Sequence, residues 1–264
     1  MDLGFKDKHV LITGSSGGIG SSITDLFLEN DALVSGIDIK KRNSNNLKNN
    51  KNFYFKEADL ESESDVKSAF HAFTAERGRI DSLVLAHGFW FPTYQAIKDL
   101  ELERWNKVIT SNLTATMLSL KYFFQNLEQF PNDEASIVLL GSTAGMYGLP
   151  GFNEYAAVKA ALVGLLKTLK VEILSYAPQG RVNLISPGIV KTSMSDVFRS
   201  NEPLLRKTLQ VSALAKVAQP DDVASMVLIL TSYLTSGHVT GENIFISGGL
   251  EGRIIHDFDK VKTT

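Results

Sequence analysis

The sequence predicts an α/β fold: one domain built on a doubly wound parallel sheet of about seven strands, with helices on both faces. Three observations predict it. Short apolar segments alternate with helical patterns along the chain, the order that produces a parallel sheet with both faces covered. The 264 residues, 44% of them hydrophobic, suffice for one large core. No repeat, linker or change in composition divides residues 1–264.

The strands and helices are placed by their apolar spacing. Short apolar segments predict strands at 9–13, 32–37, 53–56, 81–86, 136–141, 181–186 and 243–247. Helical spacing predicts helices at 18–29, 63–77, 101–127, 154–176 and 220–232. The Asn- and Lys-rich residues 40–52 show neither pattern, so we expect a solvated loop or a frayed helix there.

A glycine-rich turn, Gly14-Ser15-Ser16-Gly17-Gly18-Ile19-Gly20, joins the first strand to the first helix. Glycines 14, 18 and 20 permit a tight turn and let the backbone approach a pyrophosphate closely. The amide groups and positive dipole at the helix start would then bind the phosphates. With a strand before it and a helix after it, this turn is a candidate dinucleotide site that includes Ser16 and Ile19.

The second strand ends in Asp38, eighteen residues after Gly20. A carboxylate there can accept hydrogen bonds from both adenosine ribose hydroxyls, and it repels a 2′-phosphate. The alternative is a solvated aspartate at a strand end. Lys40, Lys41 and Arg42 are the only evidence for NADP, and Ser16 puts no basic group in the turn. We therefore expect NAD as the cofactor.

Tyr155 and Lys159 lie one helical turn apart in an otherwise apolar segment, so both project from one face. A fixed cation favours a phenolate and lowers the pKa of a phenol from its usual value near ~10. A shift of ~2–3 units requires roughly 3–4 kcal/mol, which one buried cation and a positively charged cofactor ring could supply. We therefore predict that Tyr155 exchanges protons near neutral pH. The alternative is a buried tyrosine whose neighbouring lysine reaches solvent.

The patterns Thr13-Gly-x-x-x-Gly18-x-Gly20 and Tyr155-x-x-x-Lys159 resemble the compact short-chain dehydrogenases/reductases, from about residue 5 to about residue 250. The resemblance implies a Rossmann-like, NAD-binding oxidoreductase domain. Further positions match the family pattern one by one: Asp59 and Leu60, which flank the adenine; Asn112 and Ser142, which are catalytic; and Pro187, Gly188, Ile189 and Thr192, which form the loop that holds the nicotinamide carboxamide.

The segment after the fourth strand departs from the family. The usual Asn-Asn-Ala-Gly is Leu85-Ala86-His87-Gly88 here. Gly88 still lets the backbone pass close to the cofactor. The absent Asn would tie neighbouring strands together, so we expect its loss to affect local stability more than chemistry. His87 is expected to fill space left by the altered packing, with contact to the ribose or a substrate as the alternative.

The resemblance also implies the catalytic roles. Tyr155 exchanges a proton with the substrate oxygen while hydride passes between the substrate carbon and nicotinamide C4. Lys159 lowers the phenol pKa and binds the nicotinamide ribose. Ser142 orients the substrate oxygen and steadies its charge, and Asn112 anchors a water that relays protons from Lys159. Taken alone, Ser142 is equally well a turn cap at a strand end, and Asn112 an irregularity in a helix.

The substrate side of the predicted site is apolar and aromatic. Phe89-Trp90-Phe91-Pro92 follows the fourth strand, and residues 146–152 precede Tyr155. Residues 192–215 correspond to the mobile lid of the family, and 250–264 form a C-terminal tail. These segments predict a cavity suited to a ring or an acyl chain, with about half of the aromatic residues in the ordinary core.

We therefore expect an NAD(H)-dependent oxidoreductase that acts on a secondary alcohol or ketone of apolar, cyclic or polyol type. One alternative is a 3-oxoacyl-thioester reductase of fatty-acid metabolism, a branch that usually prefers NADP. The other is a non-catalytic, dinucleotide-binding regulator. An enoyl reductase is not expected, because in that branch the tyrosine and lysine stand further apart.

Residues 156–166 are apolar all round except for Lys159, and 113–124 are similarly apolar. A helix on a solvated sheet face needs only one apolar stripe, so a second partner is expected. In the family these two helices pair with their symmetry mates, which implies a homodimer within a homotetramer. The alternative partner is the chain's own segment 192–215.

The composition excludes several other classes. A net charge of −2 and a pI near 6.2 give no electrostatic footprint for nucleic acid. No apolar run reaches the ~18 residues of a membrane span, and the first residues are not a signal peptide. The absence of Cys excludes disulfides and thiol chemistry, and the five His show no ligand spacing. We expect a cytoplasmic protein with a small-molecule substrate and no metal.

Overall fold

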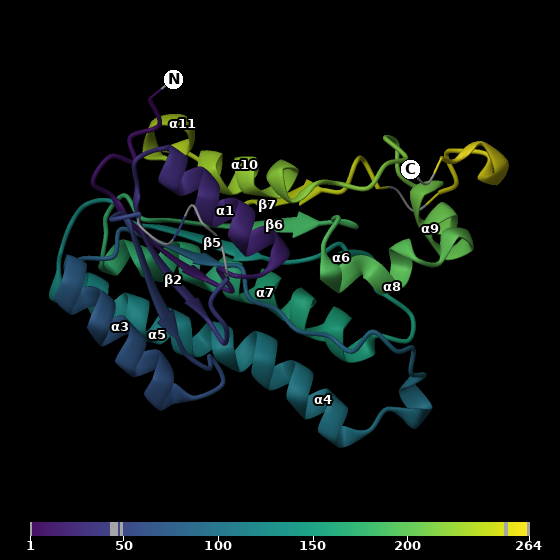
Figure 1. Ribbon diagram of the computed structural model, residues 1–264, viewed down its shortest axis with the longest axis horizontal. Coiled ribbons are helices and arrows are strands. Elements are labelled where there is room, and N and C mark those ends of the chain that lie inside the picture. Colours follow the sequence, from purple (N-terminus) through teal and green to yellow (C-terminus); the bar gives the residue numbers. More distant parts are fainter. Residues whose placement is uncertain (1, 43–46, 48–49, 251–252, 263–264) are drawn as a thin grey trace.

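The computed structural model describes residues 2–42, 47, 50–250 and 253–262. Seven parallel strands form one sheet in the order β3-β2-β1-β4-β5-β6-β7 (Figure 1). They are β1 (His9–Thr13), β2 (Leu33–Asp38), β3 (Phe53–Glu57), β4 (Ser82–Leu85), β5 (Ser136–Leu140), β6 (Arg181–Pro187) and β7 (Asn243–Ile246). The predicted fold class, a doubly wound Rossmann-like single domain, is confirmed.

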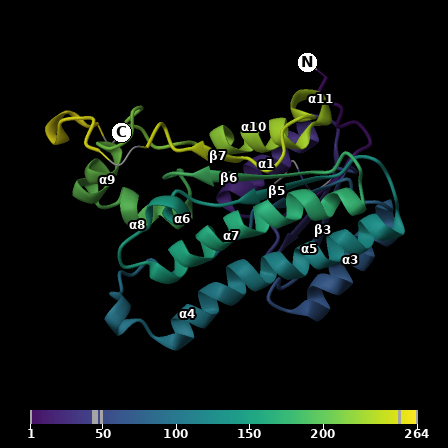
Figure 2. The same cartoon turned by 180° about the vertical axis from the view of Figure 1, so that it is seen from behind.

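Helices cover both faces of this sheet, as Figures 1 and 2 show from opposite sides. The longer ones are α1 (Gly18–Glu29), α3 (Glu63–Arg77), α4 (Leu102–Ile109), α5 (Ala115–Gln129), α7 (Asn153–Glu172) and α10 (Pro220–Thr231). Along β1 the side chains alternate between two cores, because successive residues of a strand point to opposite faces. Val10 and Ile12 pack with α1 and α10, whereas Leu11 packs with α3, α5 and α7.

The order of the strands determines where a ligand can bind. From β1 the chain moves outward to β2 and β3, then returns to pair β4 with the other side of β1. The segments after β1 and β4 therefore diverge at the carboxyl edge of the sheet and leave a crevice between them. Ligands of open α/β sheets bind at such a topological switch point.

The region predicted as one helix at 101–127 differs from the prediction. It is divided into α4, a π-helical turn, η2 (Thr110–Thr114), and α5. A π-turn closes i→i+5 hydrogen bonds and interrupts the regular helix, often at a functional site. Apolar spacing continues through the turn, so it gave no signal of the interruption. The helix predicted at 154–176 ends in a 3₁₀ turn, η3 (Ile173–Ser175).

Short helices also occur where the sequence predicted none. They are η1 (Ile97–Asp99), α6 (Ala144–Tyr147), η4 (Ser193–Ser195), α8 (Asp196–Arg199), α9 (Glu202–Leu209), α11 (Tyr233–Ser236) and η5 (Phe258–Lys260). Most are a single turn, too short for a helical period to be visible in the sequence. The two-turn α9 begins at a capping residue, Asn201, whose side chain accepts a hydrogen bond from the Leu204 N–H at 3.1 Å.

None of the helices in the described ranges is long and apolar enough to cross a membrane.

Candidate active site

A cleft of about 460 Å³ follows the carboxyl ends of the strands at the switch point. It brings together residues from both ends of the chain, and of those predicted to bind cofactor it is lined by Gly14, Gly18, Ile19, Gly20, Asp38, Asp59, Leu60, Gly88, Tyr155, Lys159, Pro187 and Thr192. A neighbouring chamber of about 250 Å³ is lined by Ser142, Gly188 and Ile189. Tyr155 lines both spaces and therefore stands where they meet.

The glycine turn is packed too tightly for side chains. Gly14 has a φ of +65°, and a Cβ there would lie 2.7 Å from the Cα of His87. A Cβ on Gly20 would lie 2.0 Å from the carbonyl oxygen of Gly14. A Cβ on Gly18 would lie 2.5 Å from the Cγ2 of Thr192, so the segment after β6 rests on the start of α1. The helix start thus presents bare backbone to the cleft, which fits a pyrophosphate.

Asp38 is bound to the same turn. Its Oδ2 accepts a hydrogen bond from the Ser16 N–H at 3.0 Å, and its Oδ1 accepts one from the Ile39 N–H at 2.8 Å. Each carboxylate oxygen keeps a further acceptor position for a ribose hydroxyl. Ser16 itself does not line the cleft, because its Oγ accepts a hydrogen bond from the Arg42 N–H.

Two of the basic residues after Asp38 contact other side chains. The Arg42 guanidinium binds both carboxylate oxygens of Asp25, at 3.0 and 2.5 Å. The Nζ of Lys41 lies 5.9 Å from the ring centroid of Phe55. Because Arg42 already has a bidentate acidic partner, it is a poor candidate for binding a 2′-phosphate.

Tyr155 lies in the first turn of α7, opposite the end of β5. The Ser142 side chain follows that strand and hydrogen-bonds the Tyr155 hydroxyl, which lowers the phenol pKa. Burial acts in the opposite direction and is the larger effect, so the pKa of Tyr155 is raised to about 12. The predicted depression of this pKa is therefore not found in the protein by itself.

The position of Lys159 explains this difference. Its Nζ donates a hydrogen bond to the Leu140 carbonyl at 2.8 Å and lies 5.6 Å from the Tyr155 ring centroid. The ammonium is thus directed at the end of β5 rather than at the phenol oxygen. Burial also lowers the pKa of Lys159 to about 8, because an apolar environment disfavours the charged amine. Part of the positive charge expected beside Tyr155 is consequently absent near pH 8.

Asn112 lies in the π-turn and is buried. Its Nδ2 donates to the carbonyls of Phe89 at 2.8 Å and Val108 at 2.9 Å, and its Oδ1 accepts from the Phe89 N–H at 3.2 Å. A Cβ on Gly88 would lie 3.4 Å from this Oδ1 and 3.6 Å from the Lys159 Nζ. Asn112 therefore fixes the segment after β4 beside the ammonium, a role that the sequence did not indicate.

His87 does more than fill space, contrary to the expectation. Its Nδ1 lies 2.7 Å from the Thr13 Oγ1, and its Nε2 lies 3.3 Å from the Thr116 Oγ1. The ring thus ties the end of β1 to α5, which replaces the tie that the family's Asn would provide. Burial, helped by the charge of Lys159, lowers the pKa of His87 to about 4, so the imidazole is neutral at physiological pH.

A buried ion pair next to Tyr155 was not predicted. Glu154 is fully buried at the start of α7, and its Oε1 accepts a hydrogen bond from the Arg104 Nε at 2.7 Å. The Arg104 Nη1 donates to the Thr93 Oγ1 at 3.1 Å, and the guanidinium lies 5.1 Å from the Phe91 ring centroid. The pair joins α4, the segment after β4 and the first turn of α7. A charged residue beginning an apolar helix was its only signal in the sequence.

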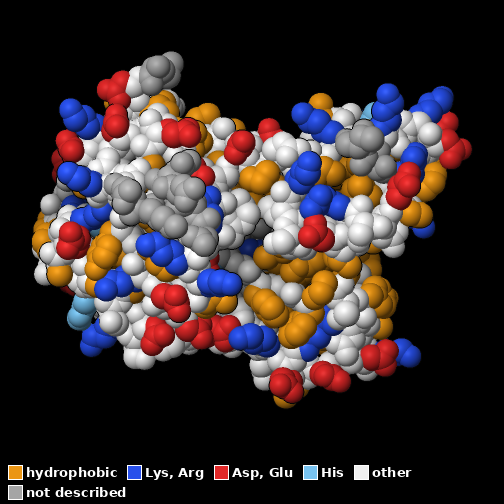
Figure 3. All heavy atoms as spheres, viewed as in Figure 1, with side chains coloured by type: hydrophobic (Ala, Val, Ile, Leu, Met, Phe, Trp, Pro, Cys, Tyr) orange, Lys and Arg blue, Asp and Glu red, His pale blue; other side chains and the backbone are white. Residues whose placement is uncertain are grey.

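Aromatic side chains line part of the chamber. Trp90 stacks on Phe198 with a centroid distance of 5.3 Å and an interplanar angle of 15°, and it also contacts Phe152 and Tyr155. Its Nε1 donates to the Met194 carbonyl at 3.2 Å. Figure 3 shows hydrophobic side chains gathered around a hollow between α8 and α4. The chamber therefore offers apolar surface to whatever approaches Tyr155.

The chain is similar to known proteins over most of its length. A family model described as "Enoyl-(Acyl carrier protein) reductase" matches residues 14–251. The 3-oxoacyl-[acyl-carrier-protein] reductase FabG of Thermotoga maritima is 32% identical over 260 residues, 92% of this chain and 97% of that protein. Human dehydrogenase/reductase SDR family member 4 is 30% identical over 266 residues, 94% of this chain and 89% of that protein.

A solved structure shares the fold over nearly the whole chain. The short-chain dehydrogenase of Leptospira borgpetersenii with bound NAD⁺ has a TM-score of 0.81 at 28% identity, covering 93% of each chain. A second structure, ElxO with NADP bound, also has a TM-score of 0.81, at 26% identity, covering 92% of this chain and 98% of that one. Neighbours of this chain thus include binders of both nicotinamide cofactors.

The burial of His87 predicts how stability depends on pH. The pKa of His87 is about 4 in the folded chain, whereas a histidine in an unfolded chain has its ordinary pKa of 6.5. Between pH 6.5 and 4 the unfolded chain takes up a proton that the folded chain cannot, so the free energy of unfolding falls as the pH falls. The difference between these two pKa values limits the loss of unfolding free energy to about 3 kcal/mol. Solvent in the cleft reaches one side of the ring and reduces the loss below this limit. His9, with a pKa also lowered to about 4 by burial, adds a similar loss.

Urea unfolding of wild type and His87→Gln at pH 7, 6, 5 and 4.5 measures this loss. The variant should be less stable at pH 7 but should lose less stability on acidification. His71→Gln, which replaces an exposed histidine, is the control and should follow wild type. A His87→Gln profile parallel to wild type would show that His87 is not the titrating group.

Proposed function

Because the chain belongs to the short-chain dehydrogenase/reductase family and is therefore an oxidoreductase, we propose that it transfers hydride between NAD(H) and a secondary alcohol or ketone. The observation that carries the proposal is the place of Tyr155. It stands where the cleft that fits a dinucleotide meets an apolar chamber, with Ser142 on its hydroxyl and Lys159 one turn behind it.

The proposed roles follow from the contacts. The Tyr155 hydroxyl donates its proton to the substrate oxygen in reduction and accepts one in oxidation. Ser142, hydrogen-bonded to the same hydroxyl, orients that oxygen. Lys159, with a pKa lowered to about 8, can return a proton to Tyr155 near neutral pH. The cofactor, when bound, supplies the hydride acceptor or donor and the positive ring that favours the phenolate.

Two further groups are proposed to complete the relay and hold the nicotinamide. Asn112 holds Gly88 and Phe89 beside Lys159, where a water can pass protons from the ammonium to solvent. The Ile189 N–H has no acceptor among the described residues, so it is free to bind a carboxamide. Thr192 packs against Gly18 and lies within reach of the same group.

We propose NAD rather than NADP as the cofactor. Asp38 is held by two backbone N–H groups at the point where the adenosine ribose is expected, and its charge repels a 2′-phosphate. Arg42, the strongest candidate for a phosphate ligand, is paired with Asp25 instead. Asp59 and Leu60 line the adenine end of the same cleft.

A second candidate is reduction of a 3-oxoacyl thioester. It is favoured by the similarity to the FabG protein of Thermotoga maritima and by the apolar chamber. Reduction of an enoyl group, the activity in the description of the matching family model, is disfavoured by the four-residue spacing of Tyr155 and Lys159. For a regulator without catalysis we find no supporting feature.

We also propose that two copies pair through α5 and α7. Ala157, Ala160 and Gly164 are exposed along α7, so the chain's own segment 192–215 does not cover them. Apart from the neighbouring backbone of α7 itself, no atom of the described residues lies within 4 Å of a Cβ built on Gly164. A glycine in an exposed helix interior costs about 1 kcal/mol relative to alanine, and close approach of a second helix would account for it. A homotetramer built from two such dimers is proposed on family resemblance alone.

Tyr155→Phe tests the chemistry. The ring stays packed but the transferable proton is lost, so kcat should fall at least ~10²-fold while the dissociation constant of NADH changes little. Initial rates with NAD are measured on a panel of sugars, cyclic alcohols, hydroxysteroids and 3-hydroxyacyl thioesters. Tyr94→Phe, at a position 70% exposed, is the matched control and should keep wild-type rates. Near-wild-type turnover by Tyr155→Phe would refute the role.

Asp38→Ala tests the choice of cofactor. Wild type should bind NADH more tightly than NADPH, and the variant should shift this ratio by at least about tenfold toward NADPH, because one charge–charge repulsion is removed. Both constants come from titrations of nucleotide fluorescence. Asp133→Ala, which removes an exposed carboxylate at the opposite edge of the sheet, should leave the ratio unchanged. Tighter binding of NADPH than of NADH by wild type would contradict the proposal.

Gly164→Leu tests the interface. The protomer has open space at this position, so the added side chain should leave the fold intact and obstruct only a partner. Sedimentation at micromolar concentration should show a dimer or tetramer for wild type and a smaller species for the variant. Lys67→Leu, which adds the same side chain on α3, is the control. A wild-type monomer of 29.0 kDa would rule out the interface.

A further inference from the structure

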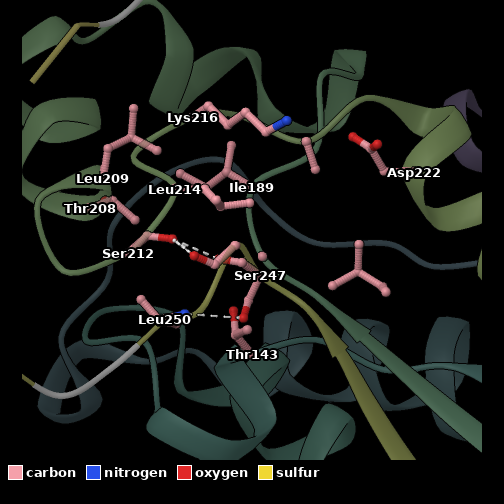
Figure 4. Close-up of a pocket in the computed structure, with 14 residues that line it drawn as sticks. Thr143, Ile189, Thr208, Leu209, Ser212, Leu214, Lys216, Asp222, Ser247 and Leu250 are labelled. Carbon is pink, nitrogen blue, oxygen red and sulfur yellow. Dashed lines mark hydrogen bonds between the residues drawn. The ribbon is translucent and has the colours of Figure 1, made fainter.

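A second cavity of about 290 Å³ lies beside the catalytic chamber (Figure 4). It is enclosed by the ends of β6 and β7, the segment that follows α9, and the start of α10. Thr143, Gly188, Ile189, Thr208 and Leu250 line both the cavity and the chamber, so the two spaces adjoin at these residues. Thr143 directly follows Ser142, and the cavity therefore begins next to the residue proposed to orient the reacting oxygen.

The walls of this side cavity present hydrocarbon. Its apolar lining includes Leu209, Leu214 and Ile246. The two serine side chains in the wall already have partners. The Ser212 Oγ donates to the carbonyls of Ser247 at 2.8 Å and Gly248 at 3.0 Å, and the Ser247 Oγ accepts from the Leu250 N–H at 3.3 Å. A group that enters meets mostly apolar atoms.

The wall is held in place by the backbone. The Ala213 N–H donates to the Gly249 carbonyl at 3.1 Å, and the Leu214 N–H donates to the Gly248 carbonyl at 2.9 Å. On the opposite side, the Ala218 N–H donates to the Ile189 carbonyl at 3.0 Å. The segment after α9 is thus fastened to the loops after both β6 and β7. The cavity is consequently a preformed space between bonded segments, as ligand sites usually are.

The end remote from Thr143 carries one charge of each sign. Lys216 and Asp222 lie there, as Figure 4 shows, and both are exposed. The Asp222 carboxylate accepts a hydrogen bond from the Gln219 N–H at 2.7 Å, which caps α10. Because opposite charges at one mouth largely cancel, this end does not select a charged group. This charged end of the cavity stays in contact with water and marks the outer limit of the apolar interior.

We propose that the side cavity binds the apolar tail of the substrate, an unbranched alkyl or acyl chain that extends from the reacting carbon past Thr143 toward Lys216. This inference rests on the proposed function, since it deepens the assignment of the chamber as the substrate site. An apolar cavity of ~150 Å³ is enough to bind benzene. The side cavity is larger than that, so it can take several methylene groups beyond those held in the chamber.

A series of methyl ketones from 2-pentanone to 2-nonanone tests the inference. With NADH and wild-type enzyme, kcat/KM should rise roughly fourfold for each methylene that enters the cavity. Ala218→Leu adds three carbons at a residue that lines the side cavity and does not line the chamber. It should lower kcat/KM for 2-nonanone at least about tenfold and leave 2-pentanone within about twofold. Ala75→Leu, at an exposed position on α3, is the control.

If Ala218→Leu fails to fold, a second variant that enlarges the cavity still tests the inference. Leu214→Ala should extend the rise in kcat/KM to longer ketones, whereas Leu234→Ala, another exposed leucine, should not. Calorimetric titration of 2-nonanone into the enzyme with bound NAD⁺, which cannot donate hydride to a ketone, measures the tail site without turnover. Ala218→Leu should weaken that binding at least about tenfold.

The outcomes separate the two proposals. Ketone reduction with no dependence on chain length would overturn the side cavity and leave the proposed function standing. Binding that strengthens with chain length and is lost in Ala218→Leu, without turnover of any ketone, would support the cavity and refute the proposed reaction on these substrates. Chain-length dependence that Ala218→Leu and Leu214→Ala both leave unchanged would overturn the inference.

Discussion

The site depends on one buried cation. Lys159 places an ammonium inside the protein, where charge is disfavoured, and its Nζ donates a hydrogen bond to the Leu140 carbonyl. That bond fixes α7 against the end of β5, and with it the register of Tyr155 opposite Ser142. The position of Tyr155 thus depends on Lys159, whereas the pKa of Tyr155 is set mainly by burial.

The second constraint is steric. The turn after β1 and the segment after β4 are in close contact. A side chain at Gly14 would therefore overlap the backbone of His87. This contact leaves no space between the two segments at the switch point. The start of α1 beside it presents the bare backbone of its glycines to the cleft. His87 then bridges Thr13 and Thr116 across the same junction. A neutral imidazole suits this position, since a second cation beside Lys159 would oppose the first.

The regular elements were predictable because their signals are local. Strand and helix boundaries follow apolar spacing, and the glycine turn and the Tyr155–Lys159 pair carry their geometry within a few residues. The ion pair of Arg104 with Glu154 was not predictable, since its members are fifty residues apart and meet only after folding. The hydrogen bonds of Asn112 and the bridge made by His87 depend likewise on contacts across the fold. Sequence spacing predicted Tyr155 and Lys159 as candidate catalytic residues but did not indicate the residues that hold them.

The arrangement has a consequence for how the catalytic pair works. Burial raises the phenol pKa to about 12 and lowers the amine pKa to about 8, so near pH 8 the protein alone keeps Tyr155 protonated and leaves Lys159 charged in only about half of the molecules. These are the directions opposite to those needed for a phenolate beside an ammonium. In the proposed reaction, the ring of an oxidised nicotinamide would add positive charge that favours the phenolate. Proton abstraction by Tyr155 would then be favoured when the cofactor is bound, whereas proton donation needs no such charge.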